Sequence, residues 1–203
     1  MARFTGSRSK ICRRFGEVIF ANAGLGKILD RRPNRPGQHG GKRVRKLSEY
    51  GEQLKEKQKA RYIYGMMEKQ FRLFFERAKA MQGITGENLL RLCETRLDNV
   101  VFRMGLAPTR AAARQLVTHR HVTVDGKVCG IPSYIVRVGE TISLREKSLK
   151  LVAVEQCLAH SKVTVSWLTF DSTTKQGSLT SLPTREEIPE NIDVQAIVEL
   201  YSR

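Results

Sequence analysis

Residues 99–124 contain no Asp or Glu, yet they carry the basic side chains Arg103, Arg110, Arg114, His119, Arg120 and His121. Arg110 and Arg114 lie four residues apart in a segment whose pattern predicts a short helix over residues 109–118, so they share one face of it. Neither has a carboxylate at helical spacing, and like charges at this spacing destabilise a helix by about 0.2–0.5 kcal/mol. We therefore expect an external polyanion to neutralise the pair.

The formal net charge of the 203-residue chain is +16, which indicates an anionic partner, either nucleic acid or an anionic membrane surface. Most of the excess lies in residues 1–46 and 101–150, whereas residues 151–203 carry more acidic than basic side chains. No stretch approaches the length of a membrane span. The basic N-terminal segment lacks the apolar core of a secretory signal, so we expect a cytoplasmic protein with no membrane contact; an organelle transit peptide remains an alternative.

The cysteines are far apart and include no Cys-x-x-Cys pair: Cys12, Cys93, Cys129 and Cys157. This spacing disfavours a structural zinc site and a disulfide framework, and it favours reduced, buried thiols. We expect neither a metal nor a cofactor.

Residues 1–46 form a basic segment in which Gly, Pro and Arg dominate. Residues 31–46 offer almost nothing to bury, so we expect them to be extended or disordered alone and to become ordered on a polyanion; a solvated tail is the alternative. The side chains of this segment that we expect to meet the polyanion include Arg13, Arg14, Arg31, Arg32, Arg35 and His39.

Helical periodicity begins after Ser48, a predicted N-cap, and runs to about Met81 with an interruption near Gly65. One face of this stretch is apolar and is expected to form a core. The opposite face offers a second, weaker phosphate-binding candidate, for which a solvated surface is the alternative: Lys55, Lys57, Lys59, Arg61 and Arg72. A further helix is predicted over residues 89–104.

The helix over residues 109–118 can be capped by Thr109. Alternation on both sides of Asp125 and Gly126 predicts a tight hairpin over residues 122–128. Further elements are strands over 135–138, 141–144 and 163–170, and a last helix starting at residue 191 or 193. Helices, then short strands, then a helix again indicate an α+β fold in two lobes.

The 109–118 helix presents two Arg among alanines rather than the Asn, Gln or Arg at successive turns that a DNA-reading helix offers to base edges. Such a face suits phosphates and grooves, as in the recognition of structured RNA.

Three segments resemble the small RNA-binding module named after small-subunit ribosomal protein four: RLDNVVFRMG at 96–105, TRAAARQLV at 109–117 and HVTVDGK at 121–127. Further segments resemble the bacterial family of that ribosomal protein, namely PGQHG at 36–40 and residues 47–59, 63–65, 68–72, 86–90 and 197–203. The resemblance covers the whole chain and weakens between about residues 150 and 191.

The resemblance implies a helical lobe and a small inserted RNA-binding module of two helices packed on a short, mainly antiparallel sheet, with a basic extended N-terminal arm. The implied divisions are residues 1–46 for the arm, 47–96 for the helical domain and 97–177 for the module with its extra strands. Residues 178–203 form a C-terminal loop and helix that complete the helical domain.

The resemblance also implies a structural constituent of the small ribosomal subunit, located in the cytoplasm. Such a protein binds 16S ribosomal RNA directly and early, nucleates assembly of the subunit body and influences translational accuracy. Its implied partners are ribosomal protein five and, where messenger RNA enters the subunit, the messenger itself. No small-molecule substrate is expected.

The RNA contacts that the resemblance implies are Arg103, Arg110, Arg114, His119, Arg120 and His121 in the module, and Lys42, Arg43, Arg45 and Lys46 after the PGQHG segment. Some members of the family carry a four-cysteine zinc site near the N-terminus. Only Cys12 lies in that region here, so we expect no metal and an arm held by RNA contacts alone.

Two other classes of RNA binder share the module. An RNA-modifying enzyme would need a catalytic cluster, which residues 1–96 and 178–203 do not offer. A free stress-response RNA binder would not need long helical and acidic lobes. We therefore expect a structural RNA-binding protein and not an enzyme.

Overall fold

Side chains that cap backbone N–H groups set where two of the helices begin. The computed structural model describes residues 4–22, 24–42, 46–149, 151–160 and 165–202. In it, α3 (Glu49–Ile63) starts after Ser48, whose side chain accepts a hydrogen bond from the Gly51 amide. Likewise α7 (Arg110–Thr118) starts after Thr109, whose hydroxyl accepts one from Ala112 at 3.2 Å. Both predicted N-caps are therefore confirmed.

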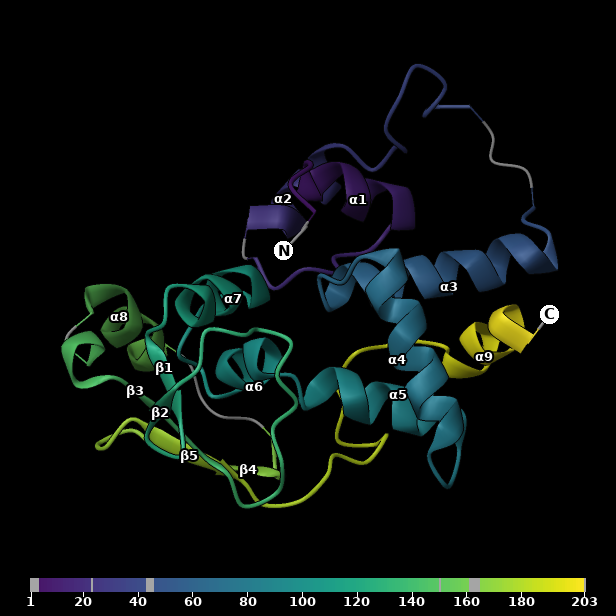
Figure 1. Cartoon of the computed structure of the whole chain (residues 1–203). Helices are drawn as coiled ribbons and strands as arrows, with labels where there is room; N and C mark the ends of the chain where they lie inside the picture. The colour runs from purple at the N-terminus through teal and green to yellow at the C-terminus, as the bar shows by residue number, and fades with distance from the viewer. Residues whose placement is uncertain (1–3, 23, 43–45, 150, 161–164, 203) are drawn as a thin grey trace. The chain divides into compact units, whose positions relative to one another are not determined.

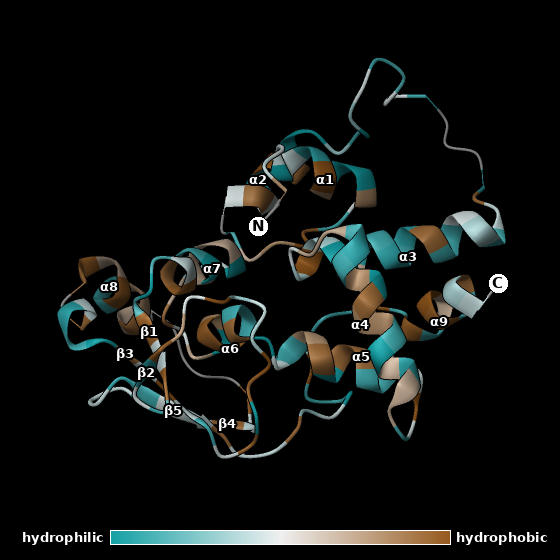
Figure 2. Cartoon of the chain, in the orientation of Figure 1, coloured by the Kyte–Doolittle hydropathy of each residue, from teal (hydrophilic) through white to brown (hydrophobic). Residues whose placement is uncertain are grey.

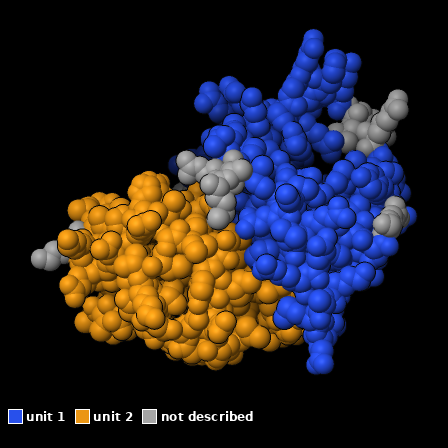
Figure 3. Space-filling model, viewed as in Figure 1, with its two compact units in different colours: residues 1–86, 191–203 blue, residues 87–190 orange. Residues whose placement is uncertain are grey.

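The described chain divides into two compact units (Figure 3). Residues 1–86 and 191–203 form the first unit, and residues 87–190 form the second unit. These boundaries lie outside the expected module of residues 97–177. The reason is that Glu94, Leu179 and Glu190 all interact inside the second unit, Leu179 in its apolar core and the two carboxylates in ion pairs.

The first unit is helical (Figure 1): α1 (Arg8–Phe15), α2 (Gly24–Arg31), α3, α4 (Glu68–Ala80), the start of α5 (Thr85–Glu94) and α9 (Val194–Ser202). The predicted interruption near Gly65 is confirmed, because Gly65 has a φ of 63° between α3 and α4. Phe75 of α4 stacks on Tyr201 of α9 with ring centroids 4.6 Å apart. Mostly hydrophilic residues make up α3 (Figure 2), which meets α9 partly through a hydrogen bond from Gln53 to Glu199.

The arm is more structured than its composition suggested. Helix α1 buries Ile11, Cys12 and Phe15, and the Phe15 ring lies edge-on to Tyr62 of α3 at 6.2 Å between centroids. The expectation of an extended arm held by RNA contacts alone is therefore wrong for residues 8–15 and 24–31. A few apolar residues suffice because α3 supplies the surface that they cover.

In the second unit, five strands of the described chain form one antiparallel sheet in the order β2-β1-β3-β5-β4. They are β1 (Val122–Val124), β2 (Lys127–Val128), β3 (Thr141–Leu144), β4 (Leu168–Asp171) and β5 (Gln176–Leu179). The predicted hairpin is confirmed: Asp125 and Gly126 join β1 to β2 with left-handed φ values of 47° and 76°. The α+β architecture is confirmed with it.

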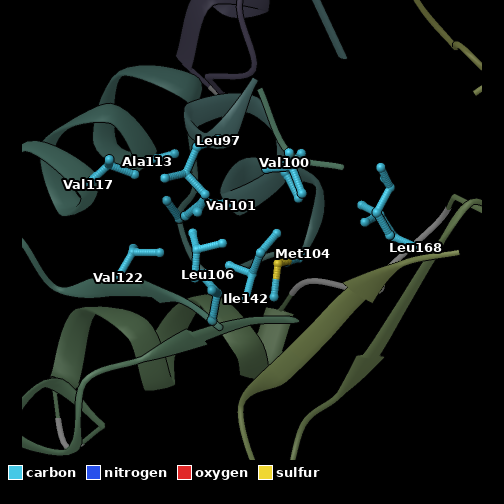
Figure 4. Packing of buried hydrophobic residues seen from close by; sticks show 14 of the residues in the cluster. Leu97, Val100, Val101, Met104, Leu106, Ala113, Val117, Val122, Ile142 and Leu168 are labelled. Atoms are coloured by element: carbon cyan, nitrogen blue, oxygen red, sulfur yellow. The ribbon is translucent and has the colours of Figure 1, made fainter. Parts of the chain in front are cut away.

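The core of the second unit lies between the sheet and α6 (Leu97–Arg103) with α7. Figure 4 shows Leu97 and Val101 of α6, Met104 directly after α6, and Val117 of α7 in one packed cluster with Ile142 of β3. Strand β3 leads into the short 3-10 helix η1 (Glu146–Ser148), and α8 (Val152–His160) follows. Trp167 is buried in this core, with 1% of its surface exposed.

Three predicted elements differ in the structure. The helix over 89–104 is broken at residues 95–96, because the Leu97 amide donates to the carbonyl of Tyr134 and the Val136 amide donates to that of Thr95. The same pairing replaces the strand over 135–138, where only an isolated bridge between Arg96 and Ile135 forms. The strand over 163–170 is observed at 168–171; residues 163–164 lie outside the described part of the chain.

Candidate nucleic-acid interface

Three arginines of the acid-free stretch, Arg103, Arg110 and Arg114, lie in a network of ion pairs inside the second unit. Arg103 of α6 donates to both carboxylate oxygens of Glu94, at 2.9 and 2.7 Å, and to Glu190 at 2.5 Å. Arg110 of α7 donates to the side-chain oxygen of Asn99 at 2.6 Å and pairs with the other oxygen of Glu190. Its guanidinium also lies 4.6 Å from the centre of the Phe102 ring. Glu190 therefore bridges two arginines on neighbouring helices.

Arg114 belongs to a second part of the same network. Its Nη1 donates to Asp98 Oδ2 at 3.0 Å, and Asp98 also receives two hydrogen bonds from Arg96, at 3.0 and 2.7 Å. Asp98 and Arg96 are buried, and 13% of the Arg114 side chain is exposed. The pair thus links the start of α6 to α7.

These contacts overturn the expectation that Arg110 and Arg114 need an external polyanion to neutralise them, and Arg103 also has carboxylate partners. The partners are absent from the helix itself because they come from residues 94, 98 and 190. Ion pairs this deeply buried are weakly screened, and removing one member leaves a charge without compensation. The need for an external polyanion at these three arginines therefore disappears, although their contact with RNA remains a prediction.

The pKa of Glu190 agrees with its position. Burial raises the pKa of this carboxyl, but Arg110 and Arg103 outweigh that effect and hold the pKa below its usual value of 4.5. Glu190 is therefore ionised at neutral pH and completes the network.

The other predicted residues of the module gather where α7 ends and β1 begins. His119 and Arg120 are exposed, and Arg120 has a left-handed φ of 61°. The His119 and His121 rings lie 6.1 Å apart, and His121 Nδ1 is 2.8 Å from the hydroxyl of Ser148. Arg145 is exposed at the same place and donates to the carbonyl of Arg120 at 3.4 Å. The structure thus brings together the predicted residues 119–121.

Sequence reasoning missed Arg145. Part of the information needed lay in the sequence, because Arg145 directly follows the strand predicted over 141–144. The antiparallel pairing of that strand with β1 brings its end beside His121, whose carbonyl accepts the Arg145 amide at 2.9 Å. Only the register of the sheet could reveal this neighbour.

The cations of α3 are mostly occupied within the first unit. Lys57 pairs with Glu68 of α4 at 2.6 Å, and Lys59 pairs with Glu17 at 2.9 Å; both lysine side chains are buried. Arg61 lies 3.6 Å from Glu68. Most of the second phosphate-binding candidate is therefore a packed surface. Of its remaining members, Lys55 is half-buried and Arg72 is exposed beside Glu76.

Glu68 is the centre of that packed surface. Burial raises its pKa, but hydrogen bonds from Lys57 and Tyr201 outweigh this effect and lower it. Burial and the nearby Glu68 raise the pKa of the Tyr201 hydroxyl, which donates to Glu68 at 3.0 Å. Glu68 thus joins α3, α4 and α9.

The arm carries the most accessible predicted contacts. Its exposed members are Arg14, Arg31, Arg32, Arg35, His39, Lys42 and Lys46. Arg13 is half-buried and donates to backbone carbonyls of the arm. Arg43 and Arg45 lie outside the described residues. No acidic residue occurs in the sequence from residue 31 to residue 46, so Arg35, His39 and Lys42 have no carboxylate within four positions of them.

Other kinds of site have little support within the residues that the structure describes. No group of three His, Cys, Asp or Glu side chains there could hold a metal ion. None of the helices described is both long enough and apolar enough to cross a membrane. Cys12, Cys93, Cys129 and Cys157 are free thiols, and burial raises the pKa of Cys93 to about 12.

Comparison with known proteins gives consistent results along the whole chain. A family model described as the ribosomal protein S4/S9 N-terminal domain matches residues 3–94, and the S4 domain matches residues 95–142. Small ribosomal subunit protein uS4 of Bacteroides thetaiotaomicron and that of Parabacteroides distasonis are each 56% identical over 206 residues, covering 100% of both chains. The same protein of Christiangramia forsetii is 53% identical over 204 residues with equal coverage. The chain therefore belongs to the uS4 family of small ribosomal subunit proteins.

Proposed function

We propose that this ribosomal protein is a structural component of the small subunit that binds 16S ribosomal RNA directly, in the cytoplasm, and catalyses no reaction. Family membership supports the place in the subunit. The distribution of accessible charge supports the binding. Arg35, His39 and Lys42 of the arm are exposed and have no acidic residue within four positions in the sequence, whereas the arginines buried in the second unit have carboxylate partners.

Two surfaces carry the proposed contact. The first is the outer side of the arm, with Arg14, Arg31, Arg32, Arg35 and Lys42. The second is the junction of α7 and β1, with His119, Arg120 and Arg145. Exposed guanidinium and ammonium groups bind phosphate oxygens by charge-assisted hydrogen bonds, and each neutralised phosphate releases condensed counterions.

The assignment of residues within the predicted set changes accordingly. Arg103, Arg110 and Arg114 act mainly by holding α6 and α7 together, and Lys57 and Lys59 by holding α3 to α4 and to the arm. The proposed phosphate contacts are the exposed cations. The ion-paired residues thus maintain the shape of the protein surface, and the exposed cations supply the charge that contacts the RNA.

The test is a binding measurement with the full chain at several salt concentrations. A fragment of 16S ribosomal RNA is compared with random duplex RNA of equal length. We expect much tighter binding to the ribosomal fragment and a linear fall of log K with log salt. Equal affinity for the two RNAs at physiological salt would contradict specific recognition.

Within the same proposal, the protein binds early, nucleates assembly of the subunit body and influences translational accuracy. Ribosomal protein five is the proposed neighbour, together with messenger RNA where it enters the subunit. Reconstitution from 16S ribosomal RNA and purified proteins tests the first part. If later proteins assembled at an unchanged rate without this chain, the nucleating role would be refuted.

A further inference from the structure

Arg13 binds the loop that follows α2. The residue lies on α1 and is half-buried. Its Nε donates to the carbonyl oxygen of Asn34 at 2.8 Å, and its Nη2 donates to that of Arg35 at 3.3 Å. The guanidinium thereby ties α1 to a loop, residues 33–42, that carries Arg35, His39 and Lys42.

The same carbonyl of Arg35 also packs against Gly40, at the other end of the loop. A Cβ atom built on Gly40 would lie 1.8 Å from the Arg35 oxygen, a distance at which no side chain fits. The Gly40 amide donates to the carbonyl of Gly37 at 3.1 Å, and Gly37 has a φ of 108°. Any residue other than glycine at position 40 would therefore push the Arg35 carbonyl out of its place beside Arg13.

The helix that carries Arg13 is anchored to the protein. Ile11, Cys12 and Phe15 of α1 are buried, and Lys59 of α3 pairs with Glu17 just beyond the helix. A guanidinium on a packed helix is a fixed point, whereas the loop it holds has few apolar residues of its own. The loop conformation therefore depends on Arg13 more than on local packing.

We propose that Arg13 is a positioning residue for the proposed RNA interface and does not itself bind phosphate. Its guanidinium holds the 33–42 loop in one conformation, so that the cations of the loop are presented together. This inference rests on the proposed function and assigns Arg13 a different task from that of its neighbour Arg14, which is exposed. A loop held before binding does not have to be ordered by the RNA, which raises affinity without adding a phosphate contact.

The experiment compares Arg13→Ala with Arg14→Ala in the full chain. Each change removes one positive charge from adjacent positions of α1. Affinity for the 16S ribosomal RNA fragment is measured across a range of salt concentrations. We expect Arg13→Ala to weaken binding about tenfold with an unchanged salt slope, since a tenfold change corresponds to roughly one charge-assisted hydrogen bond. We expect Arg14→Ala to reduce the slope by about one.

Gly40→Ala should displace the Arg35 carbonyl, and so release the 33–42 loop, without changing Arg13 itself. We expect it to weaken binding to a similar extent, and the double variant with Arg13→Ala to be little worse than either single change, because both act through the Arg35 carbonyl. Arg13→Lys should not restore full affinity, since an ammonium lacks the fixed fork that spans two carbonyls.

A readout without RNA separates this inference from the proposed function. The amide signals of Gly37 and Gly40 are followed by NMR relaxation in the free protein. We expect fast motion to increase at both glycines in Arg13→Ala and to be unchanged in Arg14→Ala. If the salt dependence of RNA binding falls in Arg13→Ala as it does in Arg14→Ala, Arg13 binds phosphate. If the relaxation of the Gly37 and Gly40 amides is unchanged in Arg13→Ala, Arg13 does not hold the loop. Either result overturns the inference. If the glycines become mobile but no variant alters RNA affinity, the arm is not an RNA interface and the positioning role falls with it.

Discussion

Replacing Asp98 by Asn tests whether the buried arginines of the second unit are structural. The Asp98 carboxylate receives two hydrogen bonds from Arg96 and one from Arg114, at 3.0, 2.7 and 3.0 Å. Arg96 is fully buried. Asparagine keeps the shape of the side chain, but it removes the charge and turns an N–H donor toward guanidinium groups.

Breaking a buried ion pair from one side costs about 3–5 kcal/mol. Because 13% of the Arg114 side chain is exposed and can be solvated, we expect a loss near the lower end, about 3 kcal/mol in the free energy of unfolding of the second unit. At an m-value of about 1.5 kcal/mol per molar urea, this loss lowers the urea midpoint by about 2 M. Trp167, the single tryptophan of the chain, is buried in the core of that unit, so its fluorescence reports the transition.

Glu186→Gln is the matched control, because Glu186 is an exposed carboxylate of the same unit and its change removes the same charge. We expect its midpoint to move by less than about 0.3 M. An Asp98→Asn midpoint within that same range would refute the structural role of the network. It would then return Arg114 to the set of cations available to RNA.

Three other changes test other parts of the structure. Glu190→Gln should lower the free energy of unfolding of the second unit by about 1–3 kcal/mol at pH 7, because Arg103 and Arg110 lose a carboxylate. The folded-state pKa of Glu190 lies below 4.5. The stabilisation by this carboxylate is therefore present above pH 4.5 and is lost as the pH falls through the folded-state pKa. The urea midpoints of Glu190→Gln and of the unchanged protein should accordingly converge at low pH. Tyr62→Leu should increase the rate of proteolysis within the arm about tenfold, because two aromatic contacts between the arm and α3 are lost. Gly86→Ala should destabilise the first unit by about 1–2 kcal/mol in thermal unfolding, because the new Cβ would lie 2.5 Å from a side chain of α9.

Features set by neighbouring residues were predictable from the sequence. Ser48 and Thr109 cap their helices through bonds to amides three residues on, and the turn at Asp125 needs only the following glycine. The apolar stripe of α4 also follows from spacing alone, because Phe71, Phe74, Phe75 and Ala78 share one helix face.

Features set by distant residues were not predictable. The break before α6 arises because backbone groups at 95–97 pair with residues 134–136, and nothing near Arg96 signals this. Arg110 looked unneutralised because its partner Glu190 lies 80 residues away. Lys59 looked exposed because the acid that covers it, Glu17, belongs to the arm. Charge patterns within one helix thus indicate which side chains need partners, while only the fold shows where the partners are.

The division of the chain has a consequence for the order in which the protein is made. Helix α9 packs against α3, where Gln53 reaches Glu199, and against α4, where Tyr201 reaches Glu68; yet all of residues 64–193 are synthesised between α3 and α9. At about 5–20 residues per second, α3 is synthesised roughly 7–26 s before its partner helix. During that interval the second unit can fold completely, whereas the polar face of α3 that contacts α9 stays in water. The largely hydrophilic character of α3 suits this wait, because an apolar face left in water until its partner is synthesised would be prone to aggregate.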